Sequence, residues 1–245
     1  MSSLATVIMA AGKGTRMKSD LPKVLHKINH RPMVHYVIDL AKKLNSDKTV
    51  LIIGHKRELV IEACSDSGVE YAVQAEQLGT AHAVQMTEPH LKDHQGDVLV
   101  LSGDVPLLTE DTLRNLISEH EKSGATATLL TSDLDDPTGY GRVMRNASGY
   151  VQKIVEHKDA SEEERRVREI NVGIYVFKGP ALFKALRKVD NNNIQGEYYL
   201  PDVISIFIKN GEKVNAVKSM NFDETRGIND INQLQEAETI LRNRS

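Results

Sequence analysis

The chain has 245 residues, of which 40% are hydrophobic, and it carries a formal net charge of −3. This length can bury one large core, or one core with a smaller lobe, and the near-neutral charge gives no reason to expect a nucleic-acid partner. The single cysteine, Cys64, excludes an intrachain disulfide, and without a signal-peptide pattern or an apolar run near about 18 residues we expect a cytoplasmic protein without a membrane partner.

The first predicted element is a buried parallel strand that begins at Leu4 and leads into a glycine-bearing loop. Cations in and just after this loop are Lys13, Arg16, Lys18 and Lys23. Gly12 and Gly14 let the main chain approach a ligand, and the cations can neutralise phosphate oxygens, so the loop predicts a polyphosphate site. The glycine spacing fits neither the P-loop nor the dinucleotide fingerprint. A turn with solvated lysines is the alternative.

Helical and strand patterns then alternate through the first half of the chain. We predict helices over 33–44, 56–64, 80–88 and 110–123, and strands over 49–53, 70–73 and 98–101. This order is typical of a Rossmann-like, doubly wound α/β fold with a mostly parallel sheet covered on both faces. Ligands of such sheets bind beyond the carboxyl ends of the strands. The opening loop and the loops after residues 73 and 101 should therefore face one crevice.

The second half of the chain is less regular. We predict strands over 126–131, 151–155, 170–177 and 214–217, a turn-rich passage over 133–143, and helical segments over 161–167, 199–210 and 230–244. We interpret residues 1–245 as a single domain, with a nucleotide-binding part over about 1–110, a small β-rich lobe over about 125–220 that lies on the crevice, and a terminal helix for which Asp230 is a plausible N-cap. No hexapeptide β-helix repeat is found.

Several polar residues follow the predicted strands. Asp104 lies just after strand 98–101, where a carboxylate can hold Mg²⁺ against phosphate oxygens or simply cap a turn before a proline. Gln74 and Gly79 can read a pyrimidine edge, although Thr80 can also be an ordinary helix N-cap. Glu156 and Asn171 suit sugar hydroxyls and an acetamido group, although asparagines are also common in turns. No H-E-x-x-H or G-x-S-x-G motif supports zinc hydrolysis or α/β-hydrolase chemistry.

The motifs resemble those of the pyrophosphorylase domains of bacterial N-acetylglucosamine-1-phosphate uridyltransferases, within the sugar-nucleotidyltransferase superfamily. The matching stretches are AAGKGTRM, QAEQLGTAHAV, GDVPLL, TGYGR, IVEHKDA, EINVGIYVF and NNNIQGEYYLPD, with GIND near the end. The resemblance implies the transfer of a uridylyl group from UTP to N-acetylglucosamine 1-phosphate, with Mg²⁺ as cofactor. It differs in two respects: Ser102 stands where the family often has tyrosine, and no β-helix follows, so we expect a monomer or weak homo-oligomer.

The resemblance also implies the roles of individual residues. Arg16 and Lys23 would be catalytic, acting on the phosphates, and Asp104 and Asn229 would be the Mg²⁺ ligands. The substrate-binding residues would be Met9, Ala10, Ala11, Gly12, Lys23, Gln74, Gly79, Thr80, Ser102, Gly103, Asp104, Gly141, Glu156, Asn171 and Asn229. Among these, Gly141, Glu156 and Asn171 would hold the sugar.

The implied reaction needs no general base, because a phosphate monoester has its second pKa near about 6 and is already mostly ionised at neutral pH. Catalysis would then rest on in-line positioning and charge neutralisation. Three alternatives stay open at this stage: a related transferase for another sugar phosphate or nucleotide, a non-catalytic nucleotide-sugar sensor, and a dinucleotide-dependent reductase, which the missing third glycine disfavours.

Overall fold

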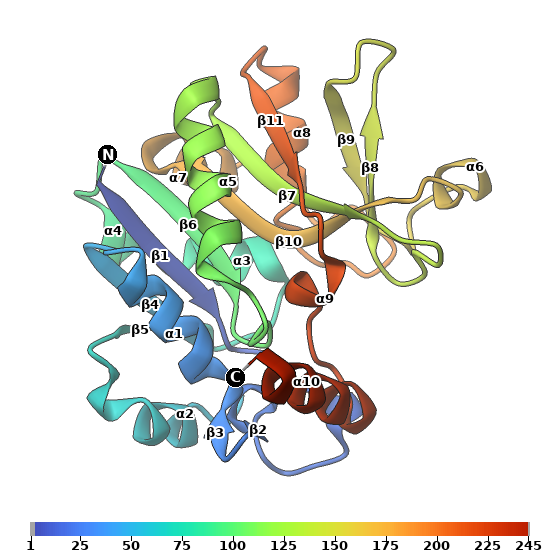
Figure 1. The fold of residues 1–245 in the computed structure, drawn as a ribbon. Helices are drawn as coiled ribbons and strands as arrows, with labels where there is room; N and C mark the ends of the chain where they lie inside the picture. Colours follow the sequence, from blue (N-terminus) through green and yellow to red (C-terminus); the bar gives the residue numbers. More distant parts are fainter. Residues whose placement is uncertain (1–2, 245) are drawn as a thin grey trace.

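One nine-stranded mixed sheet runs through the molecule in the computed structural model, which describes residues 3–244 (Figure 1). The main strand order is β11-β7-β10-β6-β1-β4-β5, with β8 and β9 attached through β10. The strands are β1 Leu4–Met9, β4 Lys48–Ile53, β5 Glu70–Val73, β6 Asp97–Ser102, β7 Ala127–Asp133, β8 Gly141–Arg145, β9 Val151–Val155, β10 Glu169–Lys178 and β11 Val214–Lys218. A separate two-stranded sheet pairs β2 (Lys27–Ile28) with β3 (Arg31–Pro32).

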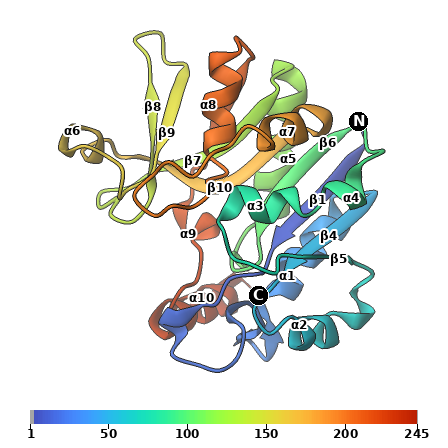
Figure 2. The ribbon, with the colours of Figure 1, turned by 180° about the vertical axis from the view of Figure 1, so that it is seen from behind.

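Helices cover both faces of the sheet. They are α1 Met33–Lys43, α2 Arg57–Ala63, α3 Thr80–Gln85, α4 Glu88–Leu91, α5 Glu110–Ser123, α6 Glu162–Arg165, α7 Gly179–Leu186, α8 Asp202–Lys209, α9 Phe222–Thr225 and α10 Ile231–Arg244, with short 3-10 turns η1 Thr15–Met17, η2 Lys23–Leu25 and η3 Ser65–Ser67. Figure 1 shows α1 and α5 on one face, and the view from behind in Figure 2 shows α3, α4 and α7 on the other. The predicted doubly wound α/β fold is confirmed.

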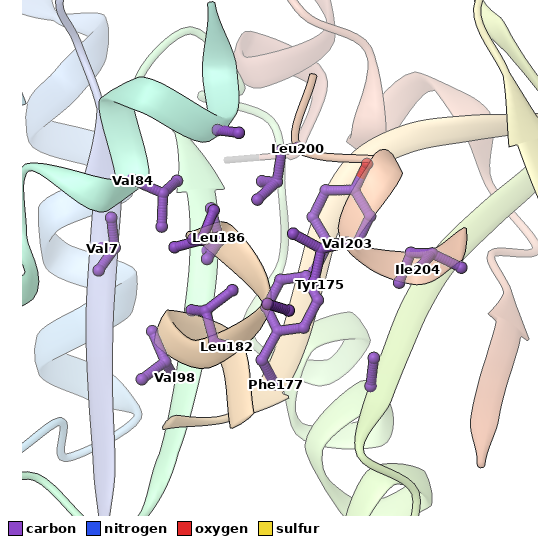
Figure 3. Close-up of a cluster of buried hydrophobic side chains, with 14 of the residues drawn as sticks. Val7, Val84, Val98, Tyr175, Phe177, Leu182, Leu186, Leu200, Val203 and Ile204 are labelled. Atoms are coloured by element: carbon purple, nitrogen blue, oxygen red, sulfur yellow. The ribbon is translucent and has the colours of Figure 1, made fainter. Parts of the chain in front are cut away.

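The core is double because successive side chains of a strand point to opposite faces. In β1, Ala5 and Val7 pack with residues of α3, α7 and α8, whereas Leu4 and Ile8 pack with residues of α1, α2 and α5. Figure 3 shows the first cluster, in which Tyr175 and Phe177 of β10 lie beside side chains of α7 and α8. Burial on both faces explains why the central strands have continuous apolar sequences.

Several details differ from the sequence prediction. The segment predicted as one helix over 80–88 is two short helices, because Pro89 lacks an amide hydrogen and lies in the first turn of α4. The helix predicted to begin at residue 199 begins at Asp202, after Pro201. Strand β8 begins inside the passage predicted to be turns, and α7 was not predicted.

The β-rich part of the second half is narrower than we expected. Strands β7, β10 and β11 continue the main sheet, and only β8 and β9 extend from it as a hairpin. Strand β10 is antiparallel to β6 and β7, and its first residues pair with β8. One strand therefore connects the central sheet directly with the β8–β9 hairpin.

Candidate active site

A cavity of about 250 Å³ lies at the carboxyl ends of β1 and β6. Ten of the residues singled out from the sequence line it: Met9, Ala10, Ala11, Gly12, Lys23, Gln74, Gly79, Thr80, Ser102 and Asp104. Gly103 lies beside them, because its amide donates to the carbonyl oxygen of Met9 at 2.9 Å. The sequence reasoning missed Val24, Gln77, Ala83 and Glu197, which also line the cavity.

One side of the cavity is formed by the loop from Gln74 to Thr80. The buried Gln74 side chain donates through Nε2 to the carbonyl oxygen of Gly79 at 3.0 Å. Gly79 has φ +118°, and a Cβ there would lie 2.5 Å from the carbonyl oxygen of Tyr198, so only glycine fits. Thr80 makes no side-chain cap of α3; its hydroxyl accepts from the amide of Leu200 at 2.9 Å. The loop is thus fixed to the segment before α8.

Lys23 and Asp104, which line the cavity, belong to a network of charged and amide groups. Lys23 Nζ forms an ion pair with Asp104 Oδ2 and donates to Asn229 Oδ1 at 3.1 Å. Arg16 Nη2 donates to the same Asn229 oxygen at 2.8 Å. The Asp104 carboxylate therefore pairs with a lysine. It does not cap a turn, which was the alternative role.

Gly14 lets the opening loop lie against Lys23. Gly14 is left-handed, with φ +60°, and a Cβ there would lie 2.6 Å from the Cβ of Lys23. A larger residue would separate the loop from η2, which begins at Lys23 directly after Pro22. Glycine at position 14 therefore allows the loop to pack against the segment from which Lys23 contacts Asp104.

Asn229 is fixed by the turn that precedes α10. The Ile228 amide donates to the carbonyl oxygen of Asp104 at 2.9 Å, and the Asn229 backbone amide donates to Gln233 Oε1 at 2.7 Å. Asp230 Oδ1 accepts from the amide of Gln233 at 2.9 Å, as expected for an N-cap. A Cβ at Gly227 would lie 3.3 Å from Asp104 Oδ2, so a small residue is favoured there. Sequence reasoning missed Gly227, although it opens the GIND motif.

The donor set fits a sparsely ligated divalent cation. Among residues 3–244, no group of three or more His, Cys, Asp or Glu side chains could hold a metal ion. Mg²⁺ usually takes only one or two protein ligands and completes its octahedron with phosphate oxygens and water. Oxygens of Asp104 and Asn229 both contact the Lys23 ammonium, so both face one cationic centre. One carboxylate oxygen and one amide oxygen match the number of protein ligands that Mg²⁺ usually has.

The three residues assigned to the sugar lie together, outside this cavity. Asn171 of β10 is the register partner of Gly141 in β8, and a Cβ at Gly141 would lie 3.0 Å from Glu156 Oε1. Asn171 Nδ2 donates to the hydroxyl of Tyr175 at 2.6 Å, across a bulge of β10. The buried Arg142 connects β8 with α6, because its Nε donates to the carbonyl oxygen of Arg165 at 3.3 Å.

Carboxylates dominate the surroundings of Glu156. It lines a second cavity, of about 390 Å³, together with Asp159 and Asp202. Burial, followed by repulsion from Asp202 and Asp159, raises the pKa of Glu156. Burial, followed by repulsion from Asp190 and Asp159, raises the pKa of Asp202 to about 6. Glu156 and Asp202 therefore hold a proton more tightly than exposed carboxyl groups do.

Comparisons with known proteins assign the family. The family described as nucleotidyl transferase matches residues 5–226. The chain belongs to the nucleotidyl transferase family. It is 53% identical over 238 residues to a "Bifunctional protein GlmU" of Geobacillus thermodenitrificans, covering 97% of this chain and 52% of that protein. A protein of the same name from Bacillus cereus is 50% identical over 244 residues, with 53% of that protein covered. The chain thus spans about half the length of the curated relatives it matches.

Solved structures support the fold of this nucleotidyl transferase chain. A UDP-glucose pyrophosphorylase complexed with UDP-glucose has a TM-score of 0.77 at 17% identity, and covers 99% of this chain and 100% of its own. A putative glucose-1-phosphate thymidylyltransferase from Bacillus anthracis has a TM-score of 0.78 at 20% identity, with 98% and 96% covered. At these identities the likeness concerns the fold alone. In the described part of the chain, no helix has the length and apolar character needed to cross a membrane.

Proposed function

We propose that this nucleotidyl transferase moves a uridylyl group from UTP to N-acetylglucosamine 1-phosphate, giving UDP-N-acetylglucosamine and pyrophosphate. The observation that carries the proposal is the convergence of Arg16, Lys23, Asp104 and Asn229 beside the cavity. Two cations that can bind phosphate oxygens and two oxygen ligands for Mg²⁺ meet there. The identity of about 50% with proteins named GlmU supports the choice of nucleotide and sugar.

Charge is the main barrier to this reaction, because an anionic phosphate attacks the α-phosphorus of a polyanion. The attacking monoester is already mostly ionised at neutral pH, since its second pKa is about 6, so the site needs no general base. Arg16 and Lys23 bind the triphosphate and stabilise the charge that shifts toward pyrophosphate. Mg²⁺ held by Asp104 and Asn229 would add Lewis-acid stabilisation of phosphoryl oxygens when bound.

The two ends of the site would select the two substrates. The Nε2 of Gln74 is already held by Gly79, which leaves the amide oxygen as the acceptor that it offers to the N3 hydrogen of uracil. On the β8–β9 side, Asn171 and Glu156 offer an amide and a carboxyl group to the acetamido group and the hydroxyls. Both groups form hydrogen bonds of defined direction, which suits an uncharged sugar.

A substrate matrix tests the proposal. Pyrophosphate release is measured for UTP, CTP, GTP, ATP and dTTP against the 1-phosphates of N-acetylglucosamine, glucosamine, glucose and galactose, with Mg²⁺ present. We expect the highest kcat/KM for UTP with N-acetylglucosamine 1-phosphate. A higher kcat/KM for another pair would contradict the assigned substrates, and binding of UDP-N-acetylglucosamine without any turnover would contradict the assigned activity.

A further inference from the structure

Lys23 connects the groups that the proposed function assigns to phosphate with those that it assigns to the metal. Its Nζ forms an ion pair with Asp104 Oδ2 and donates to Asn229 Oδ1 at 3.1 Å. Arg16 Nη2 donates to the same Asn229 oxygen at 2.8 Å. Both cations assigned to the triphosphate therefore contact the oxygens assigned to Mg²⁺.

These contacts compete with metal ligation. An ammonium group has three donors and no lone pair, so it needs the same oxygen lone pairs that a metal ion needs. Mg²⁺ binds its oxygen ligands at about 2.0–2.1 Å. An ion bound to Asp104 Oδ2 and Asn229 Oδ1 would lie close to Lys23 Nζ, and two positive charges at such a distance repel strongly in a partly buried site.

We propose that Lys23 and a divalent cation bind the Asp104–Asn229 oxygen pair alternately, so that the metal enters when a phosphate group draws Lys23 away. The inference takes the metal ligands and the role of Lys23 from the proposed function and adds a coupling between them. Lys23 keeps the Asp104 carboxylate paired whenever the metal is not bound, and this avoids an uncompensated charge at a side chain that is only 10% exposed.

The coupling is reciprocal by thermodynamic linkage. A phosphate group that attracts Lys23 strengthens metal binding, and a bound metal makes Lys23 available to phosphate to the same degree. Arg16 acts in the same direction, because phosphate also draws it from Asn229. The metal and the nucleotide would thus bind together although they have different protein ligands.

Metal binding in the absence of nucleotide tests this coupling directly. Mn²⁺, as a paramagnetic replacement for Mg²⁺, is titrated into the full chain, and the free ion is measured by electron paramagnetic resonance. We expect the Lys23→Met protein to bind Mn²⁺ at least tenfold more tightly than the unsubstituted protein, because the competing ammonium is gone. Lys13→Met removes an exposed cation of the same loop and should change the affinity by less than twofold. Equal affinity in the Lys23→Met and unsubstituted proteins would overturn the inference.

Two further variants keep the result interpretable. In Lys23→Met with Asp104→Asn, the gain in Mn²⁺ affinity should disappear; a gain that persists would place the ion elsewhere and contradict the inference. Thermal unfolding with and without Mn²⁺ shows whether each variant is folded, and Lys23→Gln replaces Lys23→Met if the latter does not unfold cooperatively. Turnover of the unsubstituted protein is measured separately: its absence contradicts the proposed function, whereas unchanged Mn²⁺ affinity contradicts only the coupling.

Discussion

The two ends of the site differ in how they manage charge. At the phosphate end, every carboxylate or amide oxygen that we assign to the metal already contacts a cation, through Lys23 or Arg16. At the sugar end, Glu156 lies near Asp159 and Asp202, and burial and like charges raise the pKa values of Glu156 and Asp202. The oxygens of the phosphate end thus contact cations, whereas the carboxyl groups of the sugar end lie near one another.

This difference follows from the ligands that each end would bind. A triphosphate and a metal ion must be bound through charge, and the cost of burying charge is lowest when each group already has a partner. A sugar is neutral, so hydrogen bonds of defined direction are more useful there than Coulomb attraction. Substitutions at the phosphate end should therefore affect turnover most, and substitutions at the sugar end should affect the binding of one substrate.

The largest effect is expected for Asp104→Asn, which removes the charge that both Lys23 and Mg²⁺ require. Turnover should fall on the order of 10³-fold, and the Mg²⁺ concentration for half-maximal rate should rise. Asn229→Ala should be milder, because a neutral ligand contributes less Coulomb attraction. The measurement is pyrophosphate release over a range of Mg²⁺ concentrations. Asp93→Asn, at an exposed site, is the matched control. Full activity of Asp104→Asn at low Mg²⁺ would contradict the role of the Asp104 charge in binding the metal.

The next effect is expected for Arg16→Ala. Turnover should fall on the order of 10²-fold, comparable with the loss of one preorganised donor to the transition state. Binding of UDP-N-acetylglucosamine should change less, because this product lacks the departing phosphates. Stopped assays of pyrophosphate release and calorimetry with the product measure the two quantities, with Lys13→Ala as the control cation. If Arg16→Ala turns over normally, the opening loop is only a solvated turn.

At the sugar end, Asn171→Ala should weaken N-acetylglucosamine 1-phosphate by about 1–3 kcal/mol and leave UTP binding nearly intact. Because Asn171 also donates to the Tyr175 hydroxyl, the substitution removes an internal hydrogen bond as well as a contact with the ligand. Tyr175→Phe removes that hydrogen bond while retaining Asn171, and should leave the Kd of the sugar phosphate almost unchanged. Calorimetry with each ligand is the measurement. An equal loss of affinity for the sugar phosphate and for UTP would contradict the assignment of Asn171 to the sugar alone.

The smallest effect concerns pH and Asp202, whose pKa is raised to about 6 from 3.8, by burial first and then by Asp190 and Asp159. The folded chain therefore holds this proton more tightly than the unfolded chain. The associated stability is fully present below pH 3.8 and is lost as the pH rises through about 6. With solvent screening, we expect a decline of about 1 kcal/mol, which Asp202→Asn should remove. Urea unfolding across this pH range measures the decline, and an equal decline in the Asp202→Asn protein would contradict the raised pKa of Asp202.

The alternation of helices and strands could be predicted because it depends on local periodicity. Helix α5 and strands β5 and β9 begin and end where the sequence predicted, since Thr109, Gly124 and the flanking turn residues mark the boundaries locally. The antiparallel insertion of β10 between β6 and β7 could not be predicted, because the sequence pattern of a strand contains no information on its neighbours.

The candidate site shows the same limit. Residue types suggested phosphate chemistry in the opening loop, but the meeting of Lys23 with Asp104 and Asn229 depends on tertiary structure. Gly227 gave no chemical signal, because its role is to leave space beside the Asp104 carboxylate. The roles of the individual site residues came from the family resemblance and stay predictions until the substitutions above are measured.

Strand β10 has a consequence for the segment that precedes it in the chain. The excursion over 134–168, which carries Gly141 and Glu156, leaves β7 after Asp133 and returns at Glu169, and these two residues are register partners in adjacent strands. Its ends therefore lie side by side in the sheet, so the pairing of β7 with β10 does not depend on the length of the segment between them. Within the segment, Gly141 and Arg142 pair with the start of β10. Under the proposed function, the residues assigned to the sugar would lie in this segment and in the first residues of β10, so the main sheet fixes both ends of the sugar-binding region.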